Sequence, residues 1–357
     1  MVRRRSRPQS ALLFAGFFVV VVALLVVAQG LRDREQAHPV VDQFGQEETV
    51  AGTPTSPTPP PRDPLNGSEL APGEEREYYA VVIENSSAAR PHRGLAGASI
   101  VYEMLAEGGI TRFLALYSGH GDTPVGPIRS VRPYIVDIAA EHGVMLVHCG
   151  GSTDALSMIS RMRYPALDEI KNPSGFYRDR LRSAPHNLFG TPETFLSLAA
   201  RKGVLTTSAR SGMVYALSPG PETVGTDDVP TLRVEYNRSY RVEWEYDADT
   251  RTYGRFMNGK PHFDPDTNRQ LRADNLVVQF VPTRVIDSEG RLAMDLSGPG
   301  DAIVSVGGMV QRVRWARQEG QTTSYTRESG DPVEFVPGTT WVQIVPVGTR
   351  VIGIGEE

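Results

Sequence analysis

An uninterrupted apolar segment near the N-terminus constrains this chain more than any other sequence feature. Residues Ala11–Ala28 carry no charged side chain, and four arginines lie among the seven residues before Ser10. A helix of about 18 residues spans roughly 27 Å, close to the hydrocarbon thickness of a bilayer. Because basic flanks stay in the cytoplasm, we expect a cytoplasmic segment at 1–10 and a transmembrane signal-anchor at 11–28. A cleaved signal peptide, cut after Val26-Val27-Ala28, is the alternative.

This topology places the remaining chain outside the cytoplasm, as a single-pass protein of the cell membrane. Cys149 is the only cysteine, so no cysteine near the N-terminal segment is available to carry a lipid. Without the four leading arginines, 33 of the 37 basic residues remain against 42 acidic residues. This acidic balance argues against nucleic acid as a partner, since binding to phosphates needs a basic surface.

The next segment has the composition of a tether. Eight prolines lie between Pro39 and Pro72, among Thr, Ser, Gly and Glu residues. Such a sequence buries too little apolar surface to fold, so we expect a disordered stalk at 29–77. A tether of this length reaches on the order of 100 Å, enough to carry the body into a cell wall.

The rest of the chain predicts an α+β protein with two domains. Domain 78–217 interleaves strands with helices and is expected to be a layered α/β domain. Its predicted strands are 78–83, 100–105, 113–117 and 144–148, and its predicted helices are 130–142, 152–162 and 192–202. A linker rich in Gly, Pro and Asp follows at 218–230. Domain 231–357 is expected to be mainly β, with strands at 232–236, 240–246, 275–281, 302–306, 309–315 and 341–346.

Several motifs together resemble the YerB-like family of exported bacterial proteins. The matching stretches include Glu107-Gly108-Gly109-Ile110-Thr111-Arg112, Gly126-Pro127-Ile128-Arg129-Ser130 with Arg132-Pro133, His148 with Gly150-Gly151-Ser152, Ala184-Pro185-His186-Asn187-Leu188, and Trp341-Val342-Gln343-Ile344-Val345-Pro346. The resemblance implies an extracytoplasmic body of two domains, and it supplies no reaction. YerB-like lipoproteins attach through a lipidated cysteine, whereas this chain is expected to use its N-terminal helix.

The first domain has a high density of ionisable residues beside glycines. Such a set is either a salt-bridge network or a ligand site, because buried charges are costly unless they are paired. We expect a ligand-binding face formed by Arg112, Arg129, Arg132, Gly150, Gly151, Ser152 and Arg178. A glycine loop that leads into a helix N-terminus exposes backbone N–H groups, and arginine offers a bidentate fork to carboxylate or phosphate.

Four residues are candidates for catalysis: Glu103, Glu107, His148 and His186. Glu103 and Glu107 suggest a glycosidase pair, but four residues of extended strand separate them by roughly 13 Å, which is too far. Ser152 is the natural N-cap of the helix that follows, and a nucleophile role with His148 or His186 is the less favoured alternative because the G-x-S-x-G elbow is absent. The histidine spacing supports no metal site, and no glycine motif supports a nucleotide cofactor.

These observations favour a membrane-tethered envelope protein that binds an anionic ligand through the arginine-rich face. The expected partner is a cell-wall polymer or a wall-assembly protein. Two alternatives remain: an enzyme that acts on wall glycan or peptide through a Glu/His cluster, and a structural scaffold without catalysis. The sequence does not choose between them.

Overall fold

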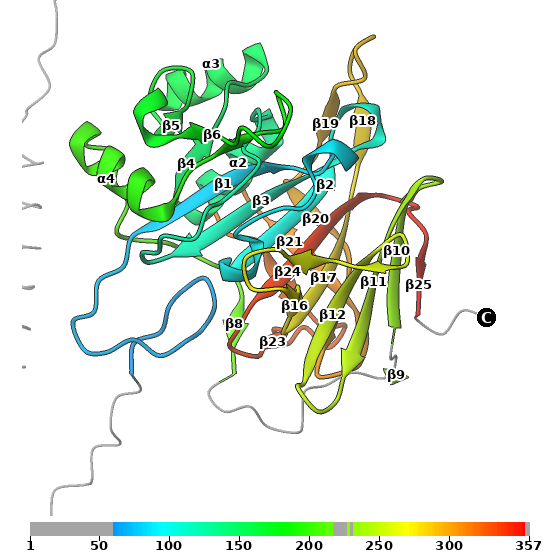
Figure 1. Ribbon diagram of the computed structural model, residues 1–357. Coiled ribbons are helices and arrows are strands. Elements are labelled where there is room, and N and C mark those ends of the chain that lie inside the picture. Colours follow the sequence, from blue (N-terminus) through cyan, green and yellow to red (C-terminus); the bar gives the residue numbers. More distant parts are fainter. Residues whose placement is uncertain (1–59, 217–226, 229–230, 354–357) are drawn as a thin grey trace, which may run out of the picture. The chain divides into compact units, whose positions relative to one another are not determined.

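A computed structural model describes residues 60–216, 227–228 and 231–353 of the chain (Figure 1). The predicted segment 1–10, the predicted signal-anchor 11–28 and most of the predicted stalk lie outside these residues. Among the residues that are described, no helix is long and apolar enough to cross a membrane. The predicted linker 218–230 also lies outside them, except for the short strand β9 (Asp227–Asp228).

One large sheet organises the described residues, within which it has eleven strands. Ten of these strands follow one another across the sheet, and β9 pairs with β21. The order is β22 (Ser324–Thr326), β21 (Met309–Arg317), β20 (Gly298–Val306), β17 (Asn275–Val281), β24 (Thr340–Pro346), β2 (Ile100–Leu105), β3 (Thr111–Ser118), β1 (Tyr78–Glu84), β4 (Met145–His148) and β5 (Ala166–Asp168).

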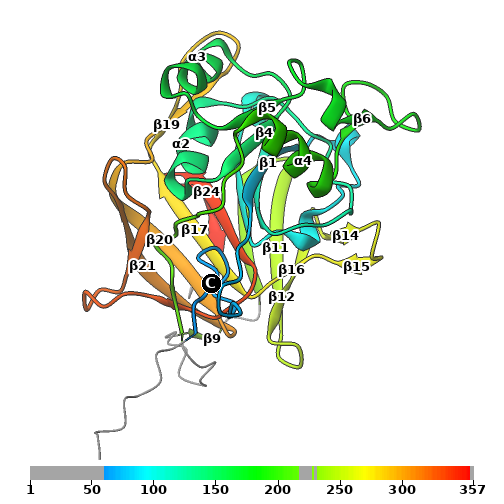
Figure 2. The same cartoon turned by 90° about the vertical axis from the view of Figure 1, so that its left-hand side faces the viewer.

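Strand β24 joins the two halves of the chain within this sheet. It pairs in parallel with β2 on one edge and with β17 on the other, and Figure 2 shows β24 beside β17. Six of its seven residues are buried, which is typical of a strand with neighbours on both edges and cover on both faces. The sheet therefore crosses the division that the sequence predicts at 218–230, and the two expected domains share one hydrogen-bonded sheet.

The remaining strands belong to a second, smaller sheet and to four two-stranded pairs. Within the described residues the small sheet has six strands: β13 (Lys260–Pro261), β12 (Thr252–Met257), β11 (Tyr240–Asp247), β10 (Thr231–Asn237), β25 (Val351–Ile352) and, paired with β12, β16 (Arg272–Ala273). The two-stranded pairs are β14–β15 (Phe263–Asp264, Arg269–Gln270), β18–β19 (Thr283–Val285, Leu292–Met294), β8–β23 (Val214–Tyr215, Glu334–Phe335) and β6–β7 (Tyr177–Arg178, Leu188–Phe189).

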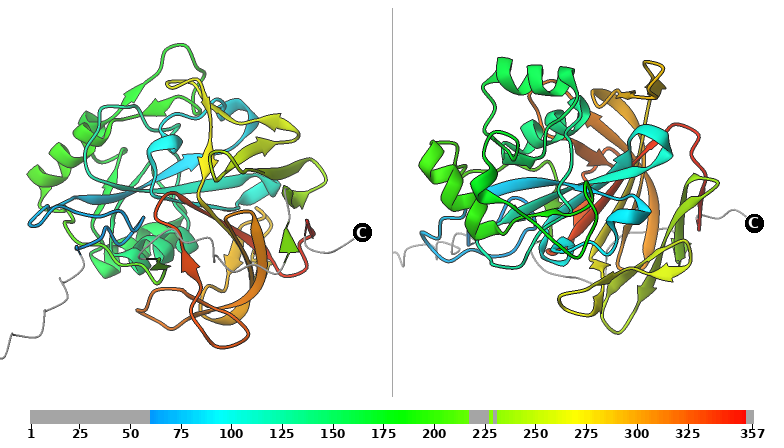
Figure 3. Two further views of the ribbon diagram at one scale, coloured as in Figure 1. Left: turned by 90° about the horizontal axis from the view of Figure 1, so that it is seen from below. Right: turned by 45° about the horizontal axis from the view of Figure 1, so that its top comes forward.

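Three α-helices occur in the described residues, and all lie within the range predicted for the first domain, 78–217: α2 (Pro133–His142), α3 (Thr153–Met162) and α4 (Pro192–Lys202). All three were predicted from the sequence, and α2 begins three residues later than expected because Pro133 occupies its first turn. Figure 3 shows these helices, in green, on the side of the body away from the small sheet. Short 3₁₀ turns lie at Ser87–Ala89, Leu95–Gly97, Glu107–Gly109 and Pro173–Gly175.

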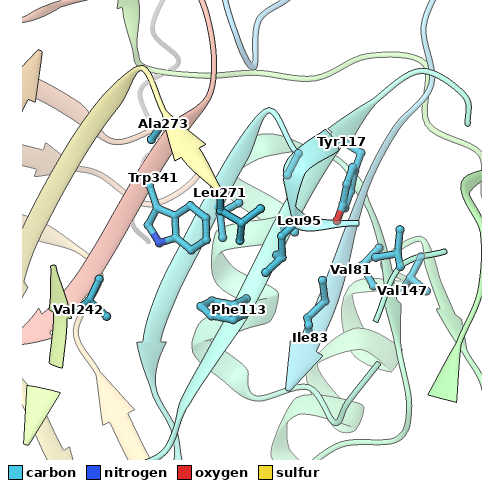
Figure 4. Packing of buried hydrophobic residues seen from close by; sticks show 14 of the residues in the cluster. Val81, Ile83, Leu95, Phe113, Tyr117, Val147, Val242, Leu271, Ala273 and Trp341 are labelled. Atoms are coloured by element: carbon cyan, nitrogen blue, oxygen red, sulfur yellow. The ribbon is translucent and has the colours of Figure 1, made fainter. Parts of the chain in front are cut away.

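Two hydrophobic cores lie on the two faces of the large sheet. On one face, side chains of β1–β4 pack under α2 and α3, and those of β17, β20 and β21 continue the same core. The other face packs against α4 and, farther along, against the small sheet. Figure 4 shows part of this second core, with Phe113 and Trp341 of the large sheet beside Val242 and Leu271. A fold built from a large mixed sheet, few helices and a small β-sheet agrees with the predicted α+β class.

Ordered structure begins earlier than the predicted end of the stalk at residue 77. Leu65 is fully buried in the core under α2, and the buried carboxylate of Asp63 pairs with Arg76 at 3.1 Å. The prolines of this stretch suggested a tether, but the stretch also carries one large apolar side chain that the body covers. Residues 60–77 are therefore part of the folded body, and the prediction of a stalk there is wrong.

Candidate functional site

The carboxyl ends of three parallel strands meet at one edge of the large sheet. Strands β1, β4 and β5 run parallel to one another, so they end together at Glu84, His148 and Asp168. Ligands of α/β proteins commonly bind at such an edge, because loops and helix N-termini gather there. The sequence-predicted site residues of the first domain, apart from Glu103, come from this edge and from the turns beside it.

A short extended segment between β1 and β4 positions two of the predicted arginines. The backbone of Glu84 donates to Pro127 O, and Arg129 donates to Val82 O, which attaches the segment to β1. On its other side, Cys149 donates to Arg129 O and Val131 donates to Gly150 O. Because the segment is hydrogen-bonded on both edges, the side chains of Arg129 and Arg132 project from a backbone of fixed conformation.

Six side chains form what we call the edge cluster: Glu84, Glu107, Arg112, Arg129, Arg132 and His186. Arg132 donates through Nε to Glu107, and Arg112 Nη2 lies 3.7 Å from the same carboxylate. Arg129 Nε lies 3.5 Å from Glu84 Oε2, and His186 Nδ1 lies 2.9 Å from that same oxygen. Three guanidinium groups therefore share two carboxylates, which leaves the cluster positively charged.

The local electrostatics reflect this sharing. Partial burial alone would raise the pKa of Glu107, but the hydrogen bond from Arg132 and the charge of Arg112 outweigh it and hold the pKa below its usual value. Burial, followed by repulsion from Arg132, lowers the pKa of Arg112. Arg112 also donates to the carbonyl of Ser130 at 3.2 Å, so this buried cation is only partly neutralised.

A pocket of about 520 Å³ opens beside the edge cluster. Its walls are Glu107, Ser130, Arg132, Gly151, Ser152, Thr153, Glu289 and Arg291. The backbone of Gly151–Thr153 is the entry to α3, and Ser152 is its N-cap, accepting a hydrogen bond from the Ala155 amide. The first N–H groups of a helix lack intrahelical partners, so this wall of the pocket favours anions. The structure thus brings Arg132, Gly151 and Ser152 together, as the sequence suggested.

A second group of polar side chains flanks the edge cluster. Cys149 Sγ donates to Glu169 at 3.3 Å, and Arg178 bridges Glu169 and Asn187 at 3.3 and 3.2 Å. Burial and the Glu169 carboxylate raise the pKa of Cys149 to about 11, so its thiol stays protonated and is a poor nucleophile. Arg178 is therefore engaged in an ion pair beside the pocket, and it does not line the pocket walls.

His148 and Gly150 have structural roles in this loop. The side chain of His148 is 1% exposed, and its Nδ1 lies 2.9 Å from the carbonyl of Gly150. Burial lowers the pKa of His148, so this imidazole is neutral. The Gly150 amide donates to the carboxylate of Asp168 at 2.8 Å, and Gly150 has a left-handed conformation, with φ 58°. His148 has no access to solvent for general-base catalysis, and neither candidate histidine hydrogen-bonds to Ser152.

Glu103 and Glu107 have separate partners. Glu107, in the turn after β2, pairs with Arg132 at the N-terminus of α2, whereas Glu103 is completely buried on the face of the large sheet toward the small sheet. Glu103 pairs with Arg255 at 2.9 Å and accepts hydrogen bonds from Tyr240, Thr111 and Asn85. The two carboxylates therefore do not form a glycosidase pair, in agreement with the spacing argument.

Comparison with known proteins shows which family the chain belongs to. A sequence profile described as "Protein of unknown function (DUF3048) N-terminal domain" matches residues 65–205, and the corresponding C-terminal profile matches 232–342. A protein of Bacillus subtilis (strain 168) named "Putative lipoprotein YerB" is 30% identical over 276 residues, which cover 76% of this chain and 82% of that protein. The chain belongs to the YerB-like family.

The structural comparison agrees with this membership. The crystal structure of the YerB protein from Bacillus subtilis matches with a TM-score of 0.73 and 29% identity, covering 81% of this chain and 99% of that chain. The shared fold has two domains with mainly strands and few helices. In this YerB-like chain the two profile-matched regions meet at the β2–β24 pairing and at the Glu103–Arg255 ion pair.

Sequence reasoning missed several residues of the edge and of the core. Glu84 and Ser86 were not among the predicted site residues, because no spacing connects them to His186, which is about a hundred residues away. Arg255 carries no local sign of its pairing with Glu103. No group of three or more His, Cys, Asp and Glu side chains among the described residues is placed to hold a metal ion.

Proposed function

We propose that this YerB-like chain is an extracytoplasmic envelope protein that binds an anionic group in the pocket beside the edge cluster. The edge cluster, in which three guanidinium groups share two carboxylates beside an open pocket, is the observation that carries this proposal. The name of the Bacillus subtilis relative describes a lipoprotein, a class held at membranes, and the predicted signal-anchor of this chain would serve the same purpose. A carboxylate or phosphate of a wall polymer, or of a wall-assembly partner, is the expected ligand.

The chemistry of the pocket supports an anion more than a neutral ligand. Arg132 reaches the pocket with an Nη2 that has no hydrogen-bond partner among the described residues, while its Nε and Nη1 are held by Glu107 and by the Val131 carbonyl. A guanidinium fixed in this way loses little side-chain entropy when it binds a ligand. The α3 N-terminus, which also lines the pocket, adds a second, weaker attraction for negative charge.

Replacement of Arg132 tests this proposal. Arg132→Ala removes one charge-assisted contact, so we expect at least a tenfold loss of affinity for inorganic phosphate or citrate. Isothermal titration calorimetry on the full-length protein measures this affinity. Arg161→Ala, at an exposed position near the end of α3, is the matched control and should bind as the parent does.

Two outcomes would contradict the proposal. The parent protein could fail to bind either anion, or Arg132→Ala could bind as tightly as the parent. A lower melting temperature for Arg132→Ala, without binding of any anion by the parent, would favour the scaffold interpretation, in which the cluster only holds the fold. Phosphate and citrate together distinguish a preference for phosphate from a preference for carboxylate.

A further inference from the structure

The edge cluster contains a carboxylate–histidine pair that anion binding does not require. His186 Nδ1 lies 2.9 Å from Glu84 Oε2, and Ser86 Oγ donates to the other oxygen, Oε1, at 2.9 Å. Arg129 approaches the same carboxylate from another side, with its Nε 3.5 Å from Oε2. Glu84 is 7% exposed, and these three contacts fix the direction of its carboxylate.

The orientation of His186 determines what its ring can do. Since a carboxylate only accepts hydrogen bonds, the proton of a neutral His186 lies on Nδ1 and the lone pair lies on Nε2. Nε2 has no hydrogen-bond partner among the described residues, and the side chain is 25% exposed. An imidazole held by a carboxylate through one nitrogen, with the other nitrogen open to solvent, is the arrangement of a general base.

A purely structural role explains the pair less well. The loop that carries His186 is already attached to the body by Arg182, which donates to the carbonyls of Ala89 and Pro91, and it is braced internally by Asn187, which donates to the carbonyls of Asp179 and Arg182. These contacts hold the loop on the body without His186. Ser86 is also not placed as a nucleophile for this base, because it lies on the Nδ1 side of the ring, 3.5 Å away.

We propose that His186, oriented by Glu84, is a general base for the hydrolysis of a carboxylic ester whose own anionic group is bound by the arginines of the edge cluster. This inference rests on the proposed anion site. In the attack step, Nε2 takes a proton from water as the water oxygen bonds to the ester carbonyl carbon and the carbonyl π electrons move to its oxygen. When the intermediate collapses, the bond from carbon to the alcohol oxygen breaks. Nε2 then returns the proton to that oxygen, which gives one acid and one alcohol.

The terminal nitrogens of Arg129 provide the link between binding and chemistry. Both lack a hydrogen-bond partner among the described residues, and they extend from the guanidinium whose Nε faces Glu84. A carboxylate or phosphate of the ligand bound to this fork would lie beside His186. This placement predicts that anionic esters are hydrolysed faster than neutral ones. An exposed histidine without neighbouring arginines would not show this preference.

Hydrolysis of 4-acetoxybenzoate, compared with that of its neutral methyl ester, tests the proposal on the full-length protein. We expect the parent to hydrolyse the anionic ester faster, and His186→Gln to lose at least a hundredfold in rate. Glu84→Gln should also lose most of the rate while the melting temperature stays near that of the parent. The control is His120→Gln, because His120 forms a similar pair with Glu77, 2.9 Å apart, at the opposite end of β1. This control should hydrolyse the ester as the parent does.

Calorimetry with the same ester separates the two proposals. Binding of 4-acetoxybenzoate without hydrolysis, or hydrolysis that persists in His186→Gln, would overturn the catalytic role and leave the anion site standing. Absence of ester binding, while phosphate or citrate still binds, would overturn the catalytic role alone, and absence of binding by all three anions would overturn both proposals. Equal rates for the anionic and the neutral ester would show that the arginines do not select the substrate, and would overturn the proposal as stated.

Discussion

Arg255→Ala should destabilise the protein by about 3–5 kcal/mol, because it leaves a buried carboxylate without its counter-ion. The side chains of Arg255 and Glu103 are both 0% exposed and pair at 2.9 Å. The guanidinium of Arg255 also lies over the rings of Trp341, Trp244 and Phe113, at 4.4, 5.2 and 5.6 Å from their centroids. These contacts join the small sheet to the large one, so their loss should weaken the whole body.

A double-mutant cycle separates the ion pair from the packing around it. Glu103→Gln alone leaves the Arg255 charge unpaired, so it should also cost several kcal/mol. Glu103→Gln combined with Arg255→Met removes both charges and keeps most of the volume, and should therefore recover part of the loss. Urea unfolding measures the free energies. Arg314→Ala, which breaks an exposed ion pair with Asp301, is the control and should leave stability nearly unchanged. A cost below about 1 kcal/mol for Arg255→Ala would contradict this account.

The buried Glu103–Arg255 ion pair argues against Glu103 as a catalytic residue. A loss of activity in Glu103→Gln would reflect a weakened body, because the carboxylate has no access to solvent. Position in the sequence could not reveal this, since Glu103 lies only four residues before the motif that begins with Glu107-Gly108-Gly109. Only the partner identifies the role, and that partner is 152 residues away.

Local sequence patterns predicted the helices and strands of this fold well, but they could not predict which distant strands pair. The apolar run 275–281 gave β17 with the same bounds, and Pro192 and Gly203 marked the two ends of α4. No local pattern shows that β24 inserts between β2 and β17, because the strand forms its parallel ladders with segments far away in the chain. The edge cluster was predicted in part for the same reason. Its arginines lie close together in sequence, whereas Glu84 and His186 meet only in the fold.

Acid should destabilise the protein well before its carboxylates become protonated, because four buried histidines are held neutral. Burial lowers the pKa of His92, His142, His148 and His262, and the charges of Arg90 and Arg255 add to this effect at His92, whose pKa falls to about 3. Arg255 Nε donates to His262 Nδ1, so His262 Nε2 carries the proton that it donates to His92 Nδ1 at 3.0 Å. Protonation of either ring would place two donors against each other.

The sign of the pH dependence follows from these pKa values. An unfolded histidine titrates near pH 6.5, whereas folded His92 titrates near 3, so between these values the unfolded chain binds more protons. The stabilisation is therefore complete above about pH 6.5 and is lost as the pH falls. His92 alone should lower the free energy of unfolding by about 3 kcal/mol between pH 7 and pH 4.

Urea unfolding at several pH values between 7 and 4 measures this loss. In His92→Gln the amide oxygen can still accept the hydrogen bond from His262, but the side chain no longer titrates. We therefore expect this variant to have a shallower pH dependence than the parent, whereas the exposed His120→Gln should keep the parent's slope. Since carboxylates titrate mainly below pH 4.5, a change confined to that lower range would assign the acid sensitivity to groups such as Glu107. An unfolding free energy that stays constant from pH 7 to 4.5 would show that the buried histidines are not held neutral by the fold.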